Sequence, residues 1–278
     1  SLKEIIPHEI GDYAVDVIEV GELKLMRRAM LRPAPPGCSI GHYRISAGTL
    51  GAVVKDRISQ EDLILSNNHV LANSTNGKDG KAKIGDFILQ PGVHDGGKIP
   101  QHVLARLWRF VPIHQEKSPS GCFLLRGIKN CLRTIKCQLP SFKGGKACFP
   151  EENLVDAAVA MPISSSSLNP SILGLGRVNG VAEAQVGRPI YFSGRTSGVQ
   201  KGNVLAVGST FRVKVGYNSY AIFSDQIVTS GISQPGDSGA LAINEKKEAV
   251  GLLFAGSKEA AIYNRIQNVL QHLDVILA

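Results

Sequence analysis

The stretch Gln234-Pro235-Gly236-Asp237-Ser238-Gly239 places one serine between an acidic residue and a glycine. A turn of this kind exposes a hydroxyl group and directs backbone N–H groups at one point, where a negatively charged oxygen could be stabilised. Gly236 suits such a turn because glycine adopts backbone conformations open to few other residues. The stretch therefore predicts either a reactive serine with an oxyanion hole formed by the N–H groups of Gly236 and Ser238, or an ordinary tight turn.

Two other stretches supply the partners that a reactive serine needs. Asn67-Asn68-His69 follows an apolar run, and Asp156 lies in the apolar segment 154–160. A serine hydroxyl is a poor nucleophile at neutral pH, so it needs a neighbouring base such as an imidazole. A carboxylate can hold that imidazole in the right tautomer. The sequence predicts a catalytic triad of His69, Asp156 and Ser238, although His69 alone could equally be a structural residue.

Two other carboxylates compete with Asp156 for the third position. Asp86 and Asp95 both follow His69 more closely in the chain and lie in loop-like surroundings. Asp156, in contrast, has apolar neighbours on both sides. We favour Asp156 because burying a carboxylate without a partner would be costly.

The pattern of apolar residues predicts an all-β protein. The chain has 278 residues, of which 43% are hydrophobic, enough for one large core or two smaller ones. Short apolar runs alternate with Gly, Pro, Asn and Asp, which is typical of a sandwich or barrel. A 3.6-residue apolar period predicts one helix at residues 262–277. The expected strands are residues 13–20, 45–54, 63–65, 87–90, 103–108, 155–161, 189–192, 204–207, 211–215, 221–227, 240–243 and 249–254.

The polar segment 164–171 is the predicted linker between two domains, residues 1–163 and 172–278. His69 and Asp156 precede it and Ser238 follows it, so we expect the site in a cleft between the two domains. Residues 112–150 are predicted to be an insertion in the first domain. The simplest interpretation of this insertion is a surface elaboration.

Cysteines and charge give weaker indications. The net charge is +8, and its densest part, residues 117–146, is more typical of a solvated basic face than of a nucleic-acid site. We expect no cofactor, no metal and no membrane segment, because no corresponding motif or long apolar run occurs.

The clustered cysteines favour reduced thiols, with a metal or disulfide knot as the alternative. No signal peptide is seen, which favours a cytoplasmic protein, although the N-terminus begins with Ser and could be trimmed. The cysteines are Cys38, Cys122, Cys131, Cys137 and Cys148.

These motifs resemble those of the chymotrypsin-fold, or trypsin-like, serine peptidases, in which His, Asp and Ser follow one another in this order. The closest resemblance is to bacterial trypsin-like peptidases related to the plant Nal1-like proteins. Besides the three motifs, Gln90-Pro91-Gly92, Asp95-Gly96-Gly97 and residues 187–198 carry the similarity, which spans about residues 31–265 without the insertion. The resemblance implies two six-stranded antiparallel β-barrels with the active site between them.

The resemblance also implies a substrate-binding region. Ile232 would lie at the base of the pocket for the P1 side chain, and the strand ending in Phe254, Ala255 and Gly256 would pair with the substrate backbone. Ile232 carries no charge, which favours an apolar or small P1 residue. Phe254 replaces the small hydroxyl residue that many members place against the triad acid. Asp237 is expected to pair with a buried cation or a chain end.

Two functions of different class follow. The leading hypothesis is a serine endopeptidase that cleaves polypeptides through an acyl-enzyme, with a latent enzyme awaiting a regulatory protein or a cleavage event as a variant of it. The alternative is a catalytically silent module that binds protein or nucleic acid through the basic insertion.

Overall fold

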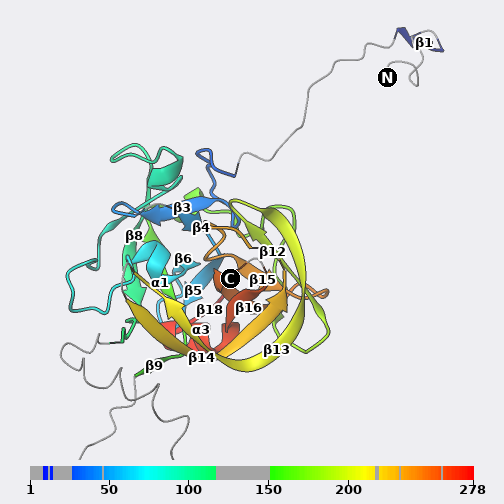
Figure 1. The fold of residues 1–278 in the computed structure, drawn as a ribbon. Helices are drawn as coiled ribbons and strands as arrows, with labels where there is room; N and C mark the ends of the chain where they lie inside the picture. The colour runs from blue at the N-terminus through cyan, green and yellow to red at the C-terminus, as the bar shows by residue number, and fades with distance from the viewer. Residues whose placement is uncertain are drawn as a thin grey trace, which may run out of the picture.

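Most of the regular secondary structure in the described chain is β-strand (Figure 1). The computed structural model describes residues 9–11, 13–14, 27–45, 47–116, 151–216, 219–231, 233–257 and 259–278. In this part of the chain, no helix is long and apolar enough to cross a membrane. The helical elements are α1 Asn68–Leu71, η2 Val93–Asp95, η3 Ser165–Ser167 and α3 Ile266–Leu273, and a separate small hairpin consists of β1 Glu9–Ile10 and β2 Tyr13–Ala14.

The first half of the chain forms a closed antiparallel barrel of six strands. Strand β4 continues into β5 through Leu50 and Gly51, so the two act as one interrupted strand. The order runs from β4/β5 through β6, β10, β8 and β7 to β3, and β3 pairs back with β4. The strands are β3 Ser39–His42, β4 Gly48–Thr49, β5 Ala52–Asp56, β6 Asp62–Ser66, β7 Phe87–Leu89, β8 Val103–Phe110 and β10 Ala158–Pro162.

The second half closes in the same way. The order β16-β15-β12-β13-β14-β17 returns to its start because β17 also pairs with β16. The predicted pair of six-stranded barrels is therefore confirmed. The strands are β12 Pro189–Gly194, β13 Gly198–Lys214, β14 Tyr220–Ser230, β15 Leu241–Ile243, β16 Glu248–Gly256 and β17 Ala261–Arg265, with β9 Glu152–Asn153 and β11 Gly180–Val181 added in parallel to β14 and β16.

Apolar side chains join the two barrels into one body. The largest core cluster contains Leu63 and Leu65 from the first barrel together with Leu241 and Leu252 from the second, all at most 1% exposed. Burying one such side chain contributes about 1.5–3 kcal/mol. This shared core fixes the position of one barrel relative to the other, and hence of any site between them.

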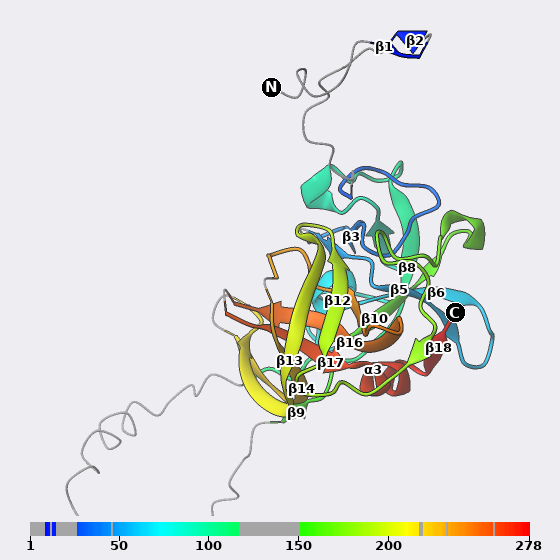
Figure 2. The same cartoon turned by 90° about the vertical axis from the view of Figure 1, so that its right-hand side faces the viewer.

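The C-terminal end of the described chain crosses back to the first barrel (Figure 2). Strand β18 Val275–Leu277 pairs with β5, although α3 before it follows directly on the second barrel. Arg109 holds this crossing: it donates to the carbonyl of Leu273 and forms an ion pair of 2.7 Å with Asp56. Strand β9, from the first half of the chain, crosses to the second barrel and pairs there with β14. The boundaries 1–163 and 172–278 remain predictions, but the sheets extend across both of them.

The elements differ from the expected ones in several places: β3, β9 and β11 were not predicted, and residues 15–20 of the predicted strand 13–20 lie outside the described residues. The predicted helix 262–277 is shortened to α3, because residues 261–265 form β17 and Asp274, with a φ of 51°, ends the helix before β18. The predicted strands 204–207 and 211–215 are parts of the single strand β13. The linker 164–171 contains η3 and is bound to Ala34 through backbone hydrogen bonds.

The insertion lies mostly outside the described residues. Only 112–116 and 151 onward are described on its two sides, so the four cysteines of the 122–148 cluster and the basic residues 117–146 are not placed. Its first residues pack inward: Ile113 is fully buried, and the Glu116 N–H donates to the Tyr220 carbonyl. Cys38 is buried and forms no disulfide with another described residue. Burial raises the pKa of the Cys38 thiol to about 12.

Candidate active site

His69 and Asp156 are in direct contact. His69 Nδ1 lies 2.5 Å from Asp156 Oδ2, and the His69 backbone N–H donates to Asp156 Oδ1 at 3.1 Å. Helix α1 produces this arrangement because Val70 and Leu71 pack into the core of the first barrel and leave the His69 side chain 30% exposed. An imidazole with Nδ1–H bound to a carboxylate presents Nε2 as a base.

The two competing carboxylates are engaged elsewhere. Asp86 lies 3.0 Å from the Nε2 atom of the buried His42. Asp95 forms an ion pair with Arg195. Neither has a hydrogen bond to His69, so Asp156 is its only carboxylate partner in the described part of the chain.

Two amide side chains from the second barrel anchor Asp156. Asn264 Oδ1 accepts the Asp156 backbone N–H at 3.0 Å, and Asn264 itself donates to Gln226 at 2.7 Å. From the first barrel, Asn67 donates to the Asp156 carbonyl at 2.8 Å. Asp156 is 2% exposed, so its carboxylate is held in a buried, fixed position. The sequence motifs did not indicate Asn264 or Gln226, which lie 108 and 70 residues further along the chain.

Phe254 is not a partner of the acid. Its ring packs on Phe223 with centroids 4.8 Å apart, and it is 5% exposed. Within the described chain, both carboxylate oxygens of Asp156 receive hydrogen bonds from His69 alone. Each carboxylate oxygen of Asp156 is thus paired without a donor at position 254.

The contact with Asp156 sets the protonation of His69. Burial lowers the pKa of the imidazole, but the negative charge and hydrogen bond of Asp156 outweigh burial and raise the pKa above its usual 6.5. A raised pKa means that this pair contributes fully to stability below pH 6.5 and that the contribution is lost as the pH rises through the folded-state pKa. The neutral imidazole that can act as a base is present above that pKa.

We predict that replacing Asp156 by Asn reverses the shift. Without the carboxylate charge only the effect of burial remains, so the pKa of His69 should fall from above 6.5 to below it. Titration of the His69 ring protons by NMR in both proteins measures the change. A pKa that is the same in the two proteins would contradict this account of the pair.

Ser238 lies on the segment next to α1. Its carbonyl accepts the Thr49 N–H at 2.8 Å, and Gly48 packs between this carbonyl and the side chain of Val70, the residue after His69. The following residue, Gly239, packs against Ser66 at the end of β6. The structure thus brings the chain segments of Ser238 and His69 together, but no hydrogen bond joins the Ser238 hydroxyl to His69 or to another described side chain.

The turn before Ser238 is held in shape by Asp237. Its buried carboxylate accepts the N–H groups of Gln234, Thr196 and Ser197 at 2.8–3.0 Å. These backbone donors bind the carboxylate directly, and the buried guanidinium of Arg27 is near enough to interact with its charge but forms no ion pair with it. Gly236 has a φ of 101°, which requires glycine, and neither its N–H nor that of Ser238 has an acceptor in the described structure.

A pocket of about 510 Å³ opens beside Ser238. Ala255 and Gly256 line it, as expected for the substrate-binding strand, whereas the buried Phe254 does not. The expected pocket residue Ile232 lies outside the described residues. No charged side chain is among the described lining residues, which are Ser233, Gln234, Pro235, Ser238, Leu253, Ala255, Gly256 and Ser257.

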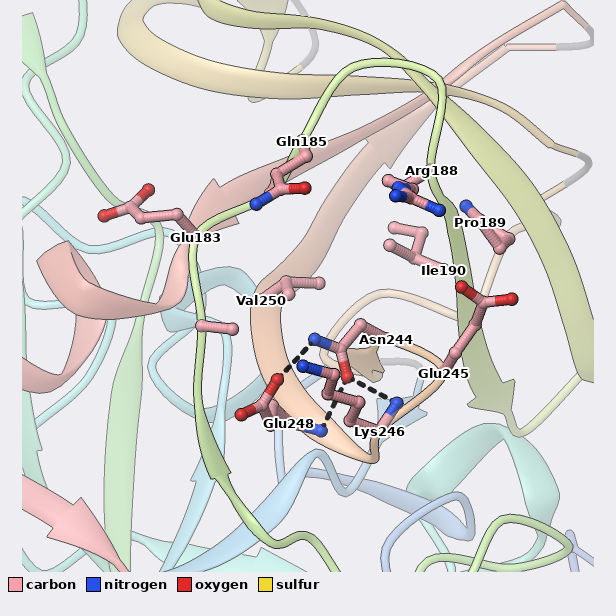
Figure 3. A pocket seen from close by; sticks show the side chains of 12 residues that line it. Glu183, Gln185, Arg188, Pro189, Ile190, Asn244, Glu245, Lys246, Glu248 and Val250 are labelled. Carbon is pink, nitrogen blue, oxygen red and sulfur yellow. Dashed lines mark hydrogen bonds between the residues drawn. The ribbon is translucent and has the colours of Figure 1, made fainter.

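A second pocket, of about 290 Å³, lies between the segment 182–190 and the turn 244–250 and shares no residue with the first (Figure 3). Asn244 shapes the turn: it donates to Glu248 at 2.7 Å and accepts the backbone N–H groups of Lys246 and Glu248. Figure 3 shows Arg188 and Glu245 at its rim and Val250 at its base. Of its charged side chains, only Glu248 is partly buried, and the lining residues include no serine or histidine.

Comparison with known proteins identifies the fold. No family model and no curated protein sequence matches the chain. Among solved structures, Thermobifida fusca Protease A is 14% identical with a TM-score of 0.53, covering 87% of this chain and 97% of its own. Nocardiopsis Protease is 17% identical with a TM-score of 0.53 and the same coverage. A glutamic acid specific serine protease is 17% identical with a TM-score of 0.54, covering 88% and 100%.

These similarities establish the chymotrypsin-like two-barrel fold. At such low identity they say nothing of the residues that act in this chain. The closer resemblance to the bacterial Nal1-like peptidases remains a prediction.

Proposed function

We propose that the protein is a serine endopeptidase that cleaves polypeptides through an acyl-enzyme. One observation carries the proposal: the pair of His69 and the buried Asp156 lies beside a turn that contains Ser238 and two N–H groups without acceptors. This combination provides a base, a hydroxyl and donors for a negatively charged oxygen. The two-barrel fold is compatible with it.

The proposed reaction proceeds in two halves. Ser238 Oγ attacks the peptide carbonyl carbon while His69 Nε2 takes the hydroxyl proton, and the carbonyl oxygen becomes an oxyanion bound by the N–H groups of Gly236 and Ser238. The intermediate expels the amine, which receives the proton from His69, and leaves an ester on Ser238. Water then attacks this ester with the same help from His69, which releases the acid and restores the hydroxyl. Asp156 keeps Nδ1 protonated and stabilises the imidazolium.

The reaction requires a hydrogen bond from Ser238 to His69 that the structure does not contain. Such bonds are often long or poorly aligned without substrate and tighten when it binds.

We propose a neutral, small or apolar P1 residue. The pocket beside Ser238 has no charged lining residue among those described, and the hydroxyl of Ser233 packs against Gly256. The exposed end of β16 at Gly256 would pair with the substrate backbone by strand addition. Digestion of a peptide library followed by mass spectrometry reads this preference; cleavage mainly after Lys, Arg or Glu would contradict it.

We further propose that the enzyme needs no cleavage to become active. Three backbone donors already satisfy the Asp237 carboxylate, so no newly formed N-terminus is needed to hold the turn. Control by a regulatory protein partner is compatible with this proposal.

The test is covalent labelling of the intact folded protein with a phosphonylating serine probe. We expect one adduct, located on Ser238 by peptide mapping, and none on heat-unfolded protein. If the folded protein is neither labelled nor able to cleave any library peptide, the endopeptidase is excluded and the silent binding module becomes the better interpretation.

A further inference from the structure

Asp95 and Arg195 form a buried ion pair that joins the two barrels. Arg195 Nε and Nη2 each lie 2.7 Å from one carboxylate oxygen of Asp95, and both side chains are 5% exposed. Asp95 belongs to η2, in a loop of the first barrel, and Arg195 follows β12 of the second. A two-pronged geometry of this kind fixes the guanidinium plane in position and orientation.

The remaining arm of the guanidinium reaches toward the turn of residues 234–239, which contains Gly236 and Ser238. Arg195 Nη1 donates to Thr196 Oγ1 at 3.3 Å. Because this bond occupies a lone pair of the Thr196 oxygen, the hydroxyl proton is directed elsewhere, and it is donated to the carbonyl of Pro235 at 3.0 Å. Arg195 therefore donates both to Asp95 and to Thr196, and Thr196 donates in turn to Pro235, so that a continuous series of hydrogen bonds joins the buried ion pair to this carbonyl.

The Pro235 carbonyl determines where the Gly236 N–H points. The two groups belong to the same planar trans peptide, in which C=O and N–H point in opposite directions. Holding the carbonyl toward Thr196 turns the N–H of Gly236 away from it. The guanidinium also fills the space beside Gly236, where a side-chain Cβ would overlap Arg195 Nη1. Without these contacts, the peptide between Pro235 and Gly236 could rotate, because glycine is conformationally free, and the Gly236 N–H would then point elsewhere.

We propose that Asp95, Arg195 and Thr196 are positioning residues that orient the Gly236 N–H toward the oxyanion. The proposal rests on the endopeptidase activity proposed above. It concerns the transition state and not substrate binding, because none of the three residues lines the pocket beside Ser238. The alternative is that the ion pair only stabilises the contact between the barrels.

Replacement of Thr196 by Val separates the two roles. The change removes the hydroxyl but keeps the shape of the side chain, the ion pair and the Thr196 N–H that binds Asp237. We expect kcat to fall about 10–100-fold with little change in KM and in the thermal midpoint, because one oxyanion donor contributes at most about 10²–10³-fold. The variant Thr196→Ser, which retains the hydroxyl, should restore most of kcat.

Inhibitor binding gives a readout that a structural role would not change. A peptidyl trifluoromethyl ketone forms an oxyanion on Ser238, whereas the corresponding peptidyl alcohol cannot. In Thr196→Val and Asp95→Asn, binding of the ketone should weaken at least 10-fold while binding of the alcohol stays within about 2-fold. If Asp95→Asn does not fold, Thr196→Val alone decides. Equal ketone binding by wild type and Thr196→Val overturns the positioning role but not the activity; a wild type that neither binds the ketone nor cleaves peptides overturns both.

Discussion

Replacing Ser238 by Ala should lower kcat for peptide cleavage by about 10⁶-fold, to the level that binding and the remaining donors sustain. In the proposed chemistry, the only covalent bond between enzyme and substrate forms through this hydroxyl. The fold should be retained, because the backbone contacts of Ser238 involve its carbonyl and the Ser238 hydroxyl has no hydrogen bond in the described structure. Steady-state kinetics and a thermal melt of each protein measure the two effects.

Two further variants make this result specific. His69→Ala and the double variant with Ser238→Ala should be about as inactive as Ser238→Ala alone, because residues that act as a unit are not additive. Ser233→Ala, which alters a pocket serine, should keep both cleavage and probe labelling. If Ser238→Ala retains more than about one per cent of wild-type kcat, another residue is the nucleophile.

Replacing Gly239 by Ala should destabilise the protein by about 3 kcal/mol or more. Gly239 has a φ of 96°, and a Cβ at this position would overlap Ser66 Oγ and the Thr49 carbonyl of the first barrel. Gly85 provides the matched control: its φ is 91°, but a Cβ there would have no atom within 4 Å. Gly85→Ala should therefore cost only the backbone strain, about 1–2 kcal/mol.

Thermal unfolding compares the two glycine variants. At about 2–4 °C per kcal/mol for a protein of this size, Gly239→Ala should melt several degrees below Gly85→Ala. Equal midpoints would mean that the contact between the turn 234–239 and the first barrel relaxes without cost. The close packing of this turn would then not explain its position.

The sequence predicted what short-range patterns encode. Alternating apolar residues indicated the strands, and the His69–Asp156 contact brings together two motifs that were read from the chain alone. The strand β3 was missed because Ser39–His42 has no alternation of apolar and polar residues. The helix at 262–277 was too long because Ile262 and Ile276 fit a helical period although their backbones are extended.

The supporting contacts of the site could not be predicted from spacing. Asn264 reaches Asp156, and Asp95 reaches Arg195, only because the two barrels close around one another, and the pairs are 108 and 100 residues apart. A polar residue that binds a distant backbone group has no periodicity or motif of its own. The roles of Thr196 and Gln226 likewise depend on which atoms face them in the folded chain.

The hydrogen bond from Asp156 to Asn264 has a consequence for protein synthesis. All of His69, Asp156 and Ser238 leave the ribosome before residue 264, yet the Asp156 backbone N–H lacks its acceptor until that residue has emerged and β17 has paired. A nascent chain or a fragment ending before that residue therefore carries the three reactive groups without the amide that fixes the acid. If the proposed activity is correct, such a fragment should therefore cleave no peptide until residues 261–265 have joined the second barrel.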